Sequence, residues 1–134
     1  MSRIRSGFTL VELLTVMLIL GLLAAIALPL LGRTRERAHF RAMQSDLRNL
    51  MAQQEAYFSM PVNQRYASNV AAIANFNTTL GVSVVITASG VTGWAATAAH
   101  ASLQPNQTCA VFYGTVLAIP APAVGAGVLA CTGE

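Results

Sequence analysis

The sequence predicts an α+β protein in which one long N-terminal α-helix packs on a small antiparallel β-sheet head. Three observations support this prediction: an uncharged apolar run from Leu13 to Gly32, an amphipathic pattern from Arg33 to Met60, and short β-type segments separated by turns after Pro61. A chain of 134 residues has room for one small domain and an extended element. We therefore expect a helix over residues 8–60, with a transmembrane first half and an amphipathic second half, and a sheet head over residues 61–134.

The apolar run is long enough to cross a membrane. A helix of about 20 residues rises about 30 Å, which matches the hydrocarbon core of a bilayer. Glu12, near the start of the run, carries the only formal charge between Arg5 and Arg33. A carboxylate at this position costs free energy unless it is paired, so Glu12 is a candidate functional residue. The alternative is a solvated carboxylate at headgroup level that has no task.

A short polar leader, Met1–Gly7, precedes the run and ends in a glycine followed by the aromatic Phe8. A secretory signal peptide would instead be cleaved after its apolar region, behind small residues. Ala24–Ala27 fit that pattern weakly, because Leu28–Leu31 continue the apolar run and a cut there would discard Glu12. The sequence therefore favours a different kind of leader.

The string Gly7-Phe8-Thr9-Leu10-Val11-Glu12-Leu13-Leu14 resembles the class III signal of type IV pilins and of the related pseudopilins of type II secretion. The resemblance covers residues 6–31 and includes Pro29, at the place where these proteins usually carry a helix-bending proline. It implies a ladle-like pilin fold, with helix near Pro29 that unwinds in the assembled fibre. It also implies that a prepilin peptidase cuts between Gly7 and Phe8 on the cytoplasmic face of the membrane and N-methylates Phe8. Glu12 would then pair with the terminal amine of a neighbouring subunit during assembly.

The new amine on Phe8 and the carboxylate of Glu12 are both costly in hydrocarbon. Residues four apart on a helix face each other, so each subunit could pair its own charges. A pair between subunits would set their axial stagger, because a helix out of register leaves two uncompensated charges in an apolar bundle. Losing one partner of a buried pair costs about 3–5 kcal/mol. One such pair per subunit would therefore act as a registration device.

The helix is expected to continue beyond Arg33 as an amphipathic segment and to end at Met60, before Pro61. Its apolar stripe, which should pack on the head, consists of Met43, Leu47, Leu50, Met51 and Phe58. The polar side carries a cluster of four arginines: Arg33, Arg35, Arg37 and Arg41. We interpret this cluster first as a solvated face that forms ion pairs between subunits, and second as a contact with lipid headgroups before assembly. The candidate partners on neighbouring subunits are Glu36, Asp46 and Glu55. His39 lies in the cluster without the ligand neighbours that a metal site needs.

Small and β-branched residues dominate after Pro61. A short helix is expected over Val70–Ala74. Strands are expected at Val82–Thr87, Gly93–Ala98 and Thr108–Tyr113, with shorter candidates at Val116–Ile119 and Val128–Cys131. Close turns between short strands indicate an antiparallel meander packed on the apolar stripe of the helix.

Cys109 and Cys131 are the two cysteines of the chain, and both lie in the head. In an exported protein such a pair is typically joined by a disulfide. The enclosed loop of about 22 residues would contribute roughly 3 kcal/mol of stability. The alternative is two buried free thiols, since the spacing fits neither a zinc site nor a C-x-x-C redox pair. A disulfide-closed C-terminal loop also occurs in many type IV pilins, which agrees with the resemblance.

Composition and motifs argue against several other functions. Without Met1–Gly7, six arginines stand against five acids, and residues 61–134 carry only Arg65 and Glu134 as charged residues. We therefore expect no specific nucleic-acid partner. His100 has no nucleophile motif or acidic partner, so we expect no enzyme and no bound metal or cofactor. Two sequons, at Asn77 and Asn106, make surface glycosylation a hypothesis.

We therefore predict the major pilin of a type IV pilus-like filament. Its precursor would enter the inner membrane, be cleaved by prepilin peptidase, and be polymerised by the membrane-bound pilus assembly machinery into an extracellular homo-oligomer. The first alternative is a type II secretion pseudopilin or a minor pilin. Pseudopilins commonly bind calcium near the C-terminus, and the C-terminal region here lacks a suitable acidic cluster. The second alternative is a single-pass, membrane-anchored binding module that keeps its leader and stays monomeric.

Overall fold

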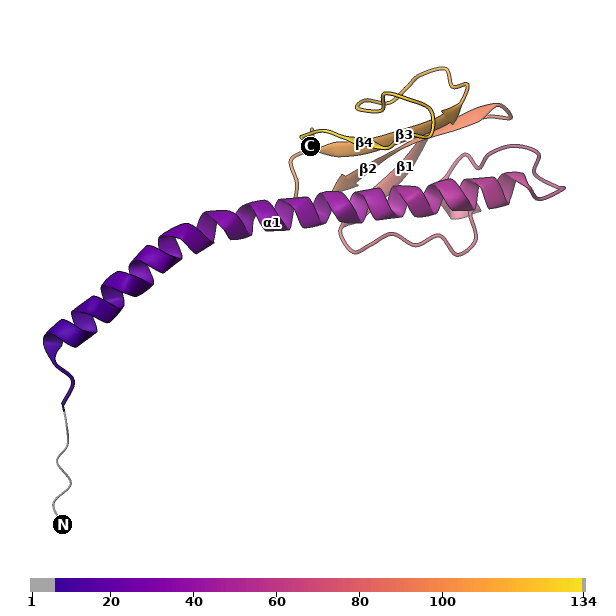
Figure 1. Ribbon diagram of the computed structural model, residues 1–134. Coiled ribbons are helices and arrows are strands. Elements are labelled where there is room, and N and C mark those ends of the chain that lie inside the picture. The colour runs from indigo at the N-terminus through magenta and orange to yellow at the C-terminus, as the bar shows by residue number, and fades with distance from the viewer. Residues whose placement is uncertain (1–6, 134) are drawn as a thin grey trace, which may run out of the picture. The chain divides into compact units, whose positions relative to one another are not determined.

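A computed structural model describes residues 7–133 of the chain, so residues 1–6 of the predicted leader lie outside the described residues, as does Glu134. The chain divides into two compact units, Met1–Arg35 and Glu36–Glu134. The division falls inside the long helix α1, which runs from Leu10 to Phe58 (Figure 1). It falls there because the residues of α1 from Glu36 onward have a sheet to pack on, and those before it do not.

In the first unit, α1 begins two residues later than expected, at Leu10. It passes through Pro29 without a break in its helical assignment. Proline has no N–H, so the carbonyl of Ala25 lacks its usual intrahelical donor at this point. Every side chain that the structure describes from Gly7 to Arg35 is exposed.

In the second unit, α1 buries a stripe of one side chain every three or four residues. The buried positions are Phe40, Met43, Asp46, Leu47, Leu50 and Gln54. This confirms the predicted packing of Met43, Leu47 and Leu50, whereas Met51 and Phe58 are only partly buried beside the stripe. The helix ends at Phe58, two residues before the predicted end. Asn63 contributes to this early end, because its Nδ2 donates to the carbonyl of Tyr57 at 3.0 Å.

The head is a four-stranded antiparallel sheet in the order β1-β2-β3-β4, so the predicted α+β fold is confirmed (Figure 1). The strands are β1 (Val82–Ser89), β2 (Gly93–His100), β3 (Thr108–Gly114) and β4 (Ala130–Cys131). A single turn of 3₁₀-helix, η1 (Val70–Ala72), lies in the expected place, and the side chain of Asn69 caps it by accepting from Ala72 N at 2.9 Å. A bulge between Ile86 and Ala88 interrupts the register of β1 with β2.

The predicted strand at Val116–Ile119 does not form, and the predicted strand over Val128–Cys131 is reduced to Ala130–Cys131. Gly114 explains the first correction, because its φ of +66° turns the chain away from the sheet immediately after β3. A side chain there would also clash, since an added Cβ would lie 2.0 Å from the carbonyl oxygen of Thr92. The following loop returns to β3 through a single bridge between Phe112 and Ala126.

The core lies between α1 and one face of the sheet. Its largest fully buried side chain is Trp94, at the start of β2, followed along the same face by the small Ala96 and Ala98. Small residues on the central strand leave room for the large side chains of the helix stripe. The Nε1 of Trp94 is buried without a hydrogen-bond partner among the described residues.

Two buried polar side chains of α1 tie the connecting segment between Pro61 and β1 to the helix. Asp46 accepts from the backbone N–H of Thr79 at 2.7 Å and from its hydroxyl at 2.9 Å. Gln54 accepts from Ala67 N at 2.9 Å and donates to Ala67 O at 3.1 Å. These bonds satisfy polar groups that burial would otherwise penalise, and they hold a segment that has little regular structure.

Candidate processing and assembly site

The predicted cleavage bond lies in an open, non-helical stretch. Gly7 and Phe8 precede the first residue of α1, and the Phe8 side chain is 79% exposed. An accessible, non-helical backbone is the form in which a peptidase can bind and cut a chain. Because Phe8 lies outside the helix, the helical rule that brings residues four apart together does not apply to Phe8 and Glu12.

Thr9 and Glu12 form a reciprocal cap at the start of α1. The Glu12 Oε2 accepts from the backbone N–H and the hydroxyl of Thr9, both at 2.9 Å. The Thr9 hydroxyl oxygen in turn accepts from Glu12 N at 3.2 Å. This arrangement is the capping box that a Thr-x-x-Glu sequence favours. The sequence interpretation assigned Glu12 only to assembly and missed this local role, although the spacing was visible.

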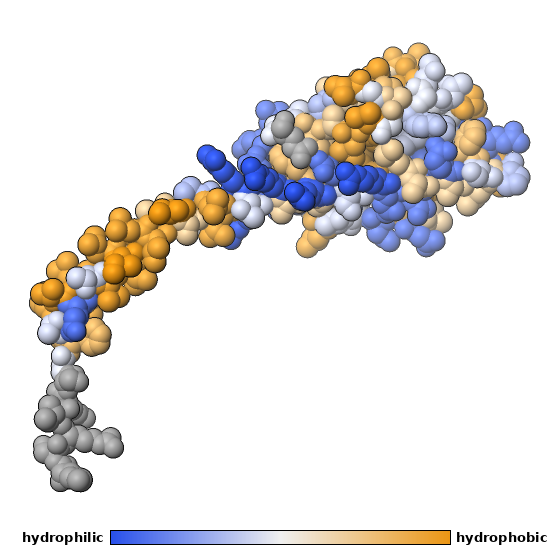
Figure 2. Space-filling view, viewed as in Figure 1, coloured by the Kyte–Doolittle hydropathy of each residue, from blue (hydrophilic) through white to orange (hydrophobic). Residues whose placement is uncertain are grey.

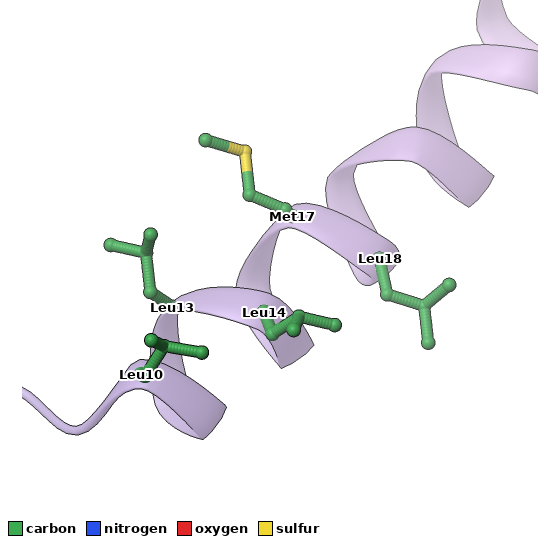
Figure 3. A pocket seen from close by; sticks show the side chains of 5 residues that line it. All are labelled: Leu10, Leu13, Leu14, Met17 and Leu18. Carbon is green, nitrogen blue, oxygen red and sulfur yellow. The ribbon is translucent and has the colours of Figure 1, made fainter.

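The helix that follows presents an apolar surface on all sides. Figure 3 shows Leu10, Leu13, Leu14, Met17 and Leu18 extending outward from it, and these side chains are 57–77% exposed. The same apolar surface covers the first part of α1 in Figure 2. Among the described residues, α1 is the one helix long and apolar enough to cross a membrane, with a best mean hydropathy of 2.7. Water is a poor solvent for such a surface, so it needs a bilayer or other protein chains around it.

The fold and this surface together define a class of protein: one with a long, apolar N-terminal helix and a small antiparallel sheet head. Residues 2–28 match the family model described as the prokaryotic N-terminal methylation motif. This motif is the class III prepilin signal typical of type IV pilins and pseudopilins. Residues 2–28 thus carry a prepilin signal of the kind found in pilin-like proteins, and together with the apolar helix this signal indicates a membrane precursor associated with filaments. The comparison with curated proteins gives no match.

In the head, Cys109 and Cys131 form the expected disulfide. The two residues face each other in the register of β3 and β4, and Cys109 is fully buried. Gln44 of α1 lies over this bond, with its Nε2 3.5 Å from the Cys131 sulfur. The disulfide therefore fastens the last strand to the sheet close to the helix.

The structure changes the list of acids that could pair with arginines of a neighbour. Asp46 is buried and accepts a hydrogen bond from Thr79 N, so the prediction that it pairs with a neighbouring subunit is wrong. Glu36 is exposed and accepts a hydrogen bond from the side chain of Gln107. Glu55 is exposed and bonded to the Tyr66 hydroxyl at 3.2 Å. The sequon residues Asn77 and Asn106 are both exposed, as glycosylation would require.

The rings of His39 and His100 lie against each other in a tilted arrangement, with centroids 3.9 Å apart and an angle of 30° between their planes. Nδ1 of His100 accepts from Ser102 N at 3.1 Å. Burial and the neighbouring His39 lower the pKa of His100, although a hydrogen bond to the Leu80 backbone opposes the shift. Within residues 7–133, no group of three or more metal-binding side chains comes together. The two histidines therefore have no third ligand beside them among these residues.

We expect this histidine pair to make the head less stable in mild acid. Since folding lowers the pKa of His100, the unfolded chain binds a proton more readily, and stability is lost as the pH falls below about 6.5. A His39→Gln variant removes the neighbouring charge and should lose less stability between pH 7.5 and pH 5. Thermal unfolding of the full chain in detergent at both pH values measures this difference. Equal losses in the two proteins would contradict the prediction.

Proposed function

We propose that this protein is the major structural subunit of a type IV pilus-like filament. Its precursor is anchored in the inner membrane by residues 8–31, and prepilin peptidase removes Met1–Gly7 and N-methylates Phe8. The pilus assembly machinery of the membrane then transfers the subunit into an extracellular homopolymer whose core is formed by the N-terminal helices.

The observation that carries this proposal is the apolar surface of α1 in the first unit. From Leu10 to Leu31 its large hydrophobic side chains are each at least 49% exposed. A bilayer covers such a surface in the precursor, and equivalent helices of other copies cover it in a filament. An assembly gives this surface an apolar environment outside the membrane, and the methylation motif at residues 2–28 favours polymerisation over a permanently anchored binding module.

Glu12 has the position that such an assembly requires. It is an exposed carboxylate at the start of the apolar surface, and its intrachain partner is a neutral threonine, so its charge remains uncompensated within the described chain. The amine that cleavage would create on Phe8 of a neighbour supplies the missing positive charge. Pro29 contributes a point at which α1 lacks a backbone hydrogen bond and can loosen as helices pack.

The head supports the role of an abundant subunit. It is small, it is closed by the Cys109–Cys131 disulfide, and its polar connecting segment is tied down by Asp46 and Gln54. An outer surface of this kind can be repeated many times along a filament without a flexible segment that interferes with its neighbours.

We expect the subunit recovered from sheared cell-surface material to begin at N-methylated Phe8. Intact-mass measurement and N-terminal fragmentation of that material test the cleavage, the methylation and any sugar on Asn77 or Asn106 together. Filaments seen by electron microscopy in the same material, composed mainly of this chain, would support the major-subunit assignment. A chain that retains Met1 and is recovered only from membranes would contradict the proposal and favour an anchored binding module.

A further inference from the structure

A charged surface whose partner the sequence left open lies on the polar side of α1 in the second unit. Three exposed arginines occupy one face of the helix and are called the arginine stripe here: Arg37, Arg41 and Arg48. Glu55 continues the same face, because it follows Arg48 by seven residues, which is two helical turns. Figure 2 shows strongly hydrophilic side chains in a row along this part of α1. No member of the stripe has an ion-pair partner among the described residues.

A hollow of 280 Å³ adjoins Glu55 and is lined by Met51, Glu55, Trp94 and Tyr113. Met51 and Trp94 provide apolar walls, and the Tyr113 side chain is 46% exposed. An arginine side chain has a long apolar stem and a flat cationic end that stacks on aromatic rings. The hollow therefore combines apolar walls for the stem, a ring for the guanidinium and a carboxylate for its charge.

Tyr66 fixes the carboxylate at this place. Its hydroxyl donates to Oε1 of Glu55 at 3.2 Å, and its ring packs edge-on to Tyr113 with centroids 6.4 Å apart. Burial, followed by the charge of Glu55, raises the pKa of Tyr66 to about 12, so its hydroxyl remains a donor at physiological pH. Oε2 of Glu55 has no hydrogen bond within the described chain and is free to accept from a guanidinium.

We propose that this hollow receives an arginine of the arginine stripe from a neighbouring copy of the chain, which forms an ion pair with Glu55 and stacks on Tyr113. This inference rests on the proposed filament function and adds a specific contact between heads. Charge complementarity identifies the occupant: the chain has no lysine, and the stripe supplies cations with free guanidinium groups on the same helix face.

The distribution of charge along this face also determines how two copies must meet. Copies placed side by side in register would bring arginine against arginine. A displacement along the helix axis brings the stripe of one copy to Glu55 of the other, at about 10 Å for Arg48 or 21 Å for Arg41. Such a head-to-tail contact joins the arginine stripe of one copy to the hollow of the next. The first copy keeps a free hollow and the second a free stripe, so the contact extends into an open polymer.

The test is the amount of filament formed by charge variants of the full chain, relative to the total subunit in the cell. Glu55→Gln keeps an acceptor for Tyr66 but loses the charge, and we expect about tenfold less filament, which corresponds to about 1.4 kcal/mol. Glu55→Arg should abolish filaments. Glu36→Gln is the matched control, because Glu36 bonds to Gln107 on the chain's own head, and it should assemble like the wild type.

Restoration identifies the partner. Glu55→Arg combined with Arg37→Glu, Arg41→Glu or Arg48→Glu should recover filaments in one combination, and that combination gives the axial displacement. A photo-crosslinking phenylalanine analogue in place of Tyr113 should attach to residues 36–48 of another copy. Wild-type assembly by all Glu55 variants, or crosslinks elsewhere only, would overturn the contact. If the wild type forms no filaments, the proposed function is contradicted instead. Crosslinks from position 113 to another copy in the membrane would then still show whether the contact between heads forms.

Discussion

Replacing Glu12 with glutamine is expected to abolish filaments while cleavage after Gly7 continues. Among the described residues the carboxylate bonds only to Thr9, so its negative charge is available to the Phe8 amine of a neighbour. Without it, each packed subunit would leave a cation uncompensated in an apolar bundle, at a cost of about 3–5 kcal/mol. This cost recurs at every subunit of the polymer. Electron microscopy of sheared material, with mass measurement of the membrane-bound chain, separates assembly from processing.

Glutamine is the informative substitution because the capping box accepts Glu or Gln at this position. Glu12→Gln therefore keeps the start of α1 and removes only the charge. Thr9→Ala is the complementary control: it removes the hydroxyl from the cap, at about 0.5–2 kcal/mol of helix stability, and leaves the carboxylate in place. We expect Thr9→Ala to be cleaved and to assemble. If Glu12→Gln forms filaments as the wild type does, the charge is not needed for assembly and the charge-pairing proposal is wrong.

The elements that the sequence predicts well are those with a strong local pattern. The apolar run, the stripe of Met43, Leu47 and Leu50, and three of the strands follow from the spacing of hydrophobic residues alone. The boundaries of α1 were less accurate because they depend on side-chain hydrogen bonds. Thr9 fixes the first turn, and Asn63 reaches back to the last one.

The predictions that failed concern contacts between residues far apart in the sequence. Asp46 reads as a surface acid in a polar stretch, yet the fold buries it against Thr79, 33 residues further along. Val116–Ile119 has strand composition, but the backbone turn at Gly114 carries it away from the sheet. The aromatic hollow beside Glu55 was also not predicted, because Met51, Trp94 and Tyr113 come from three separate elements. Periodicity cannot identify sites of this kind.

Loss of the Cys109–Cys131 disulfide is expected to lower the melting temperature of the head by roughly 12–24 °C. The bond closes a loop with a sequence separation of 22, and the chain-entropy model assigns about 3 kcal/mol to a loop of this length. In a unit of about 100 residues, each kcal/mol shifts the melting temperature by about 4–8 °C. Thermal unfolding of the full chain in detergent should show this decrease for Cys109→Ala/Cys131→Ala, where both residues are changed so that no free thiol remains.

Reduction of the wild type is the matched control, because it breaks the bond without changing a side chain elsewhere. The reduced wild type and the double variant should melt together, and reductant should not affect the variant. Hydrogen exchange then shows how the bond acts. If the disulfide mainly restricts the unfolded chain, its loss destabilises the whole head. Amides of β1 and β2 that exchange by global unfolding then lose protection together with those of β3. If it mainly holds β4, whose ladder to β3 has only two residue pairs, faster exchange is confined to residues 115–131 and the melting temperature changes little. The second result would contradict the predicted decrease and would make the disulfide a local clamp on the C-terminal loop.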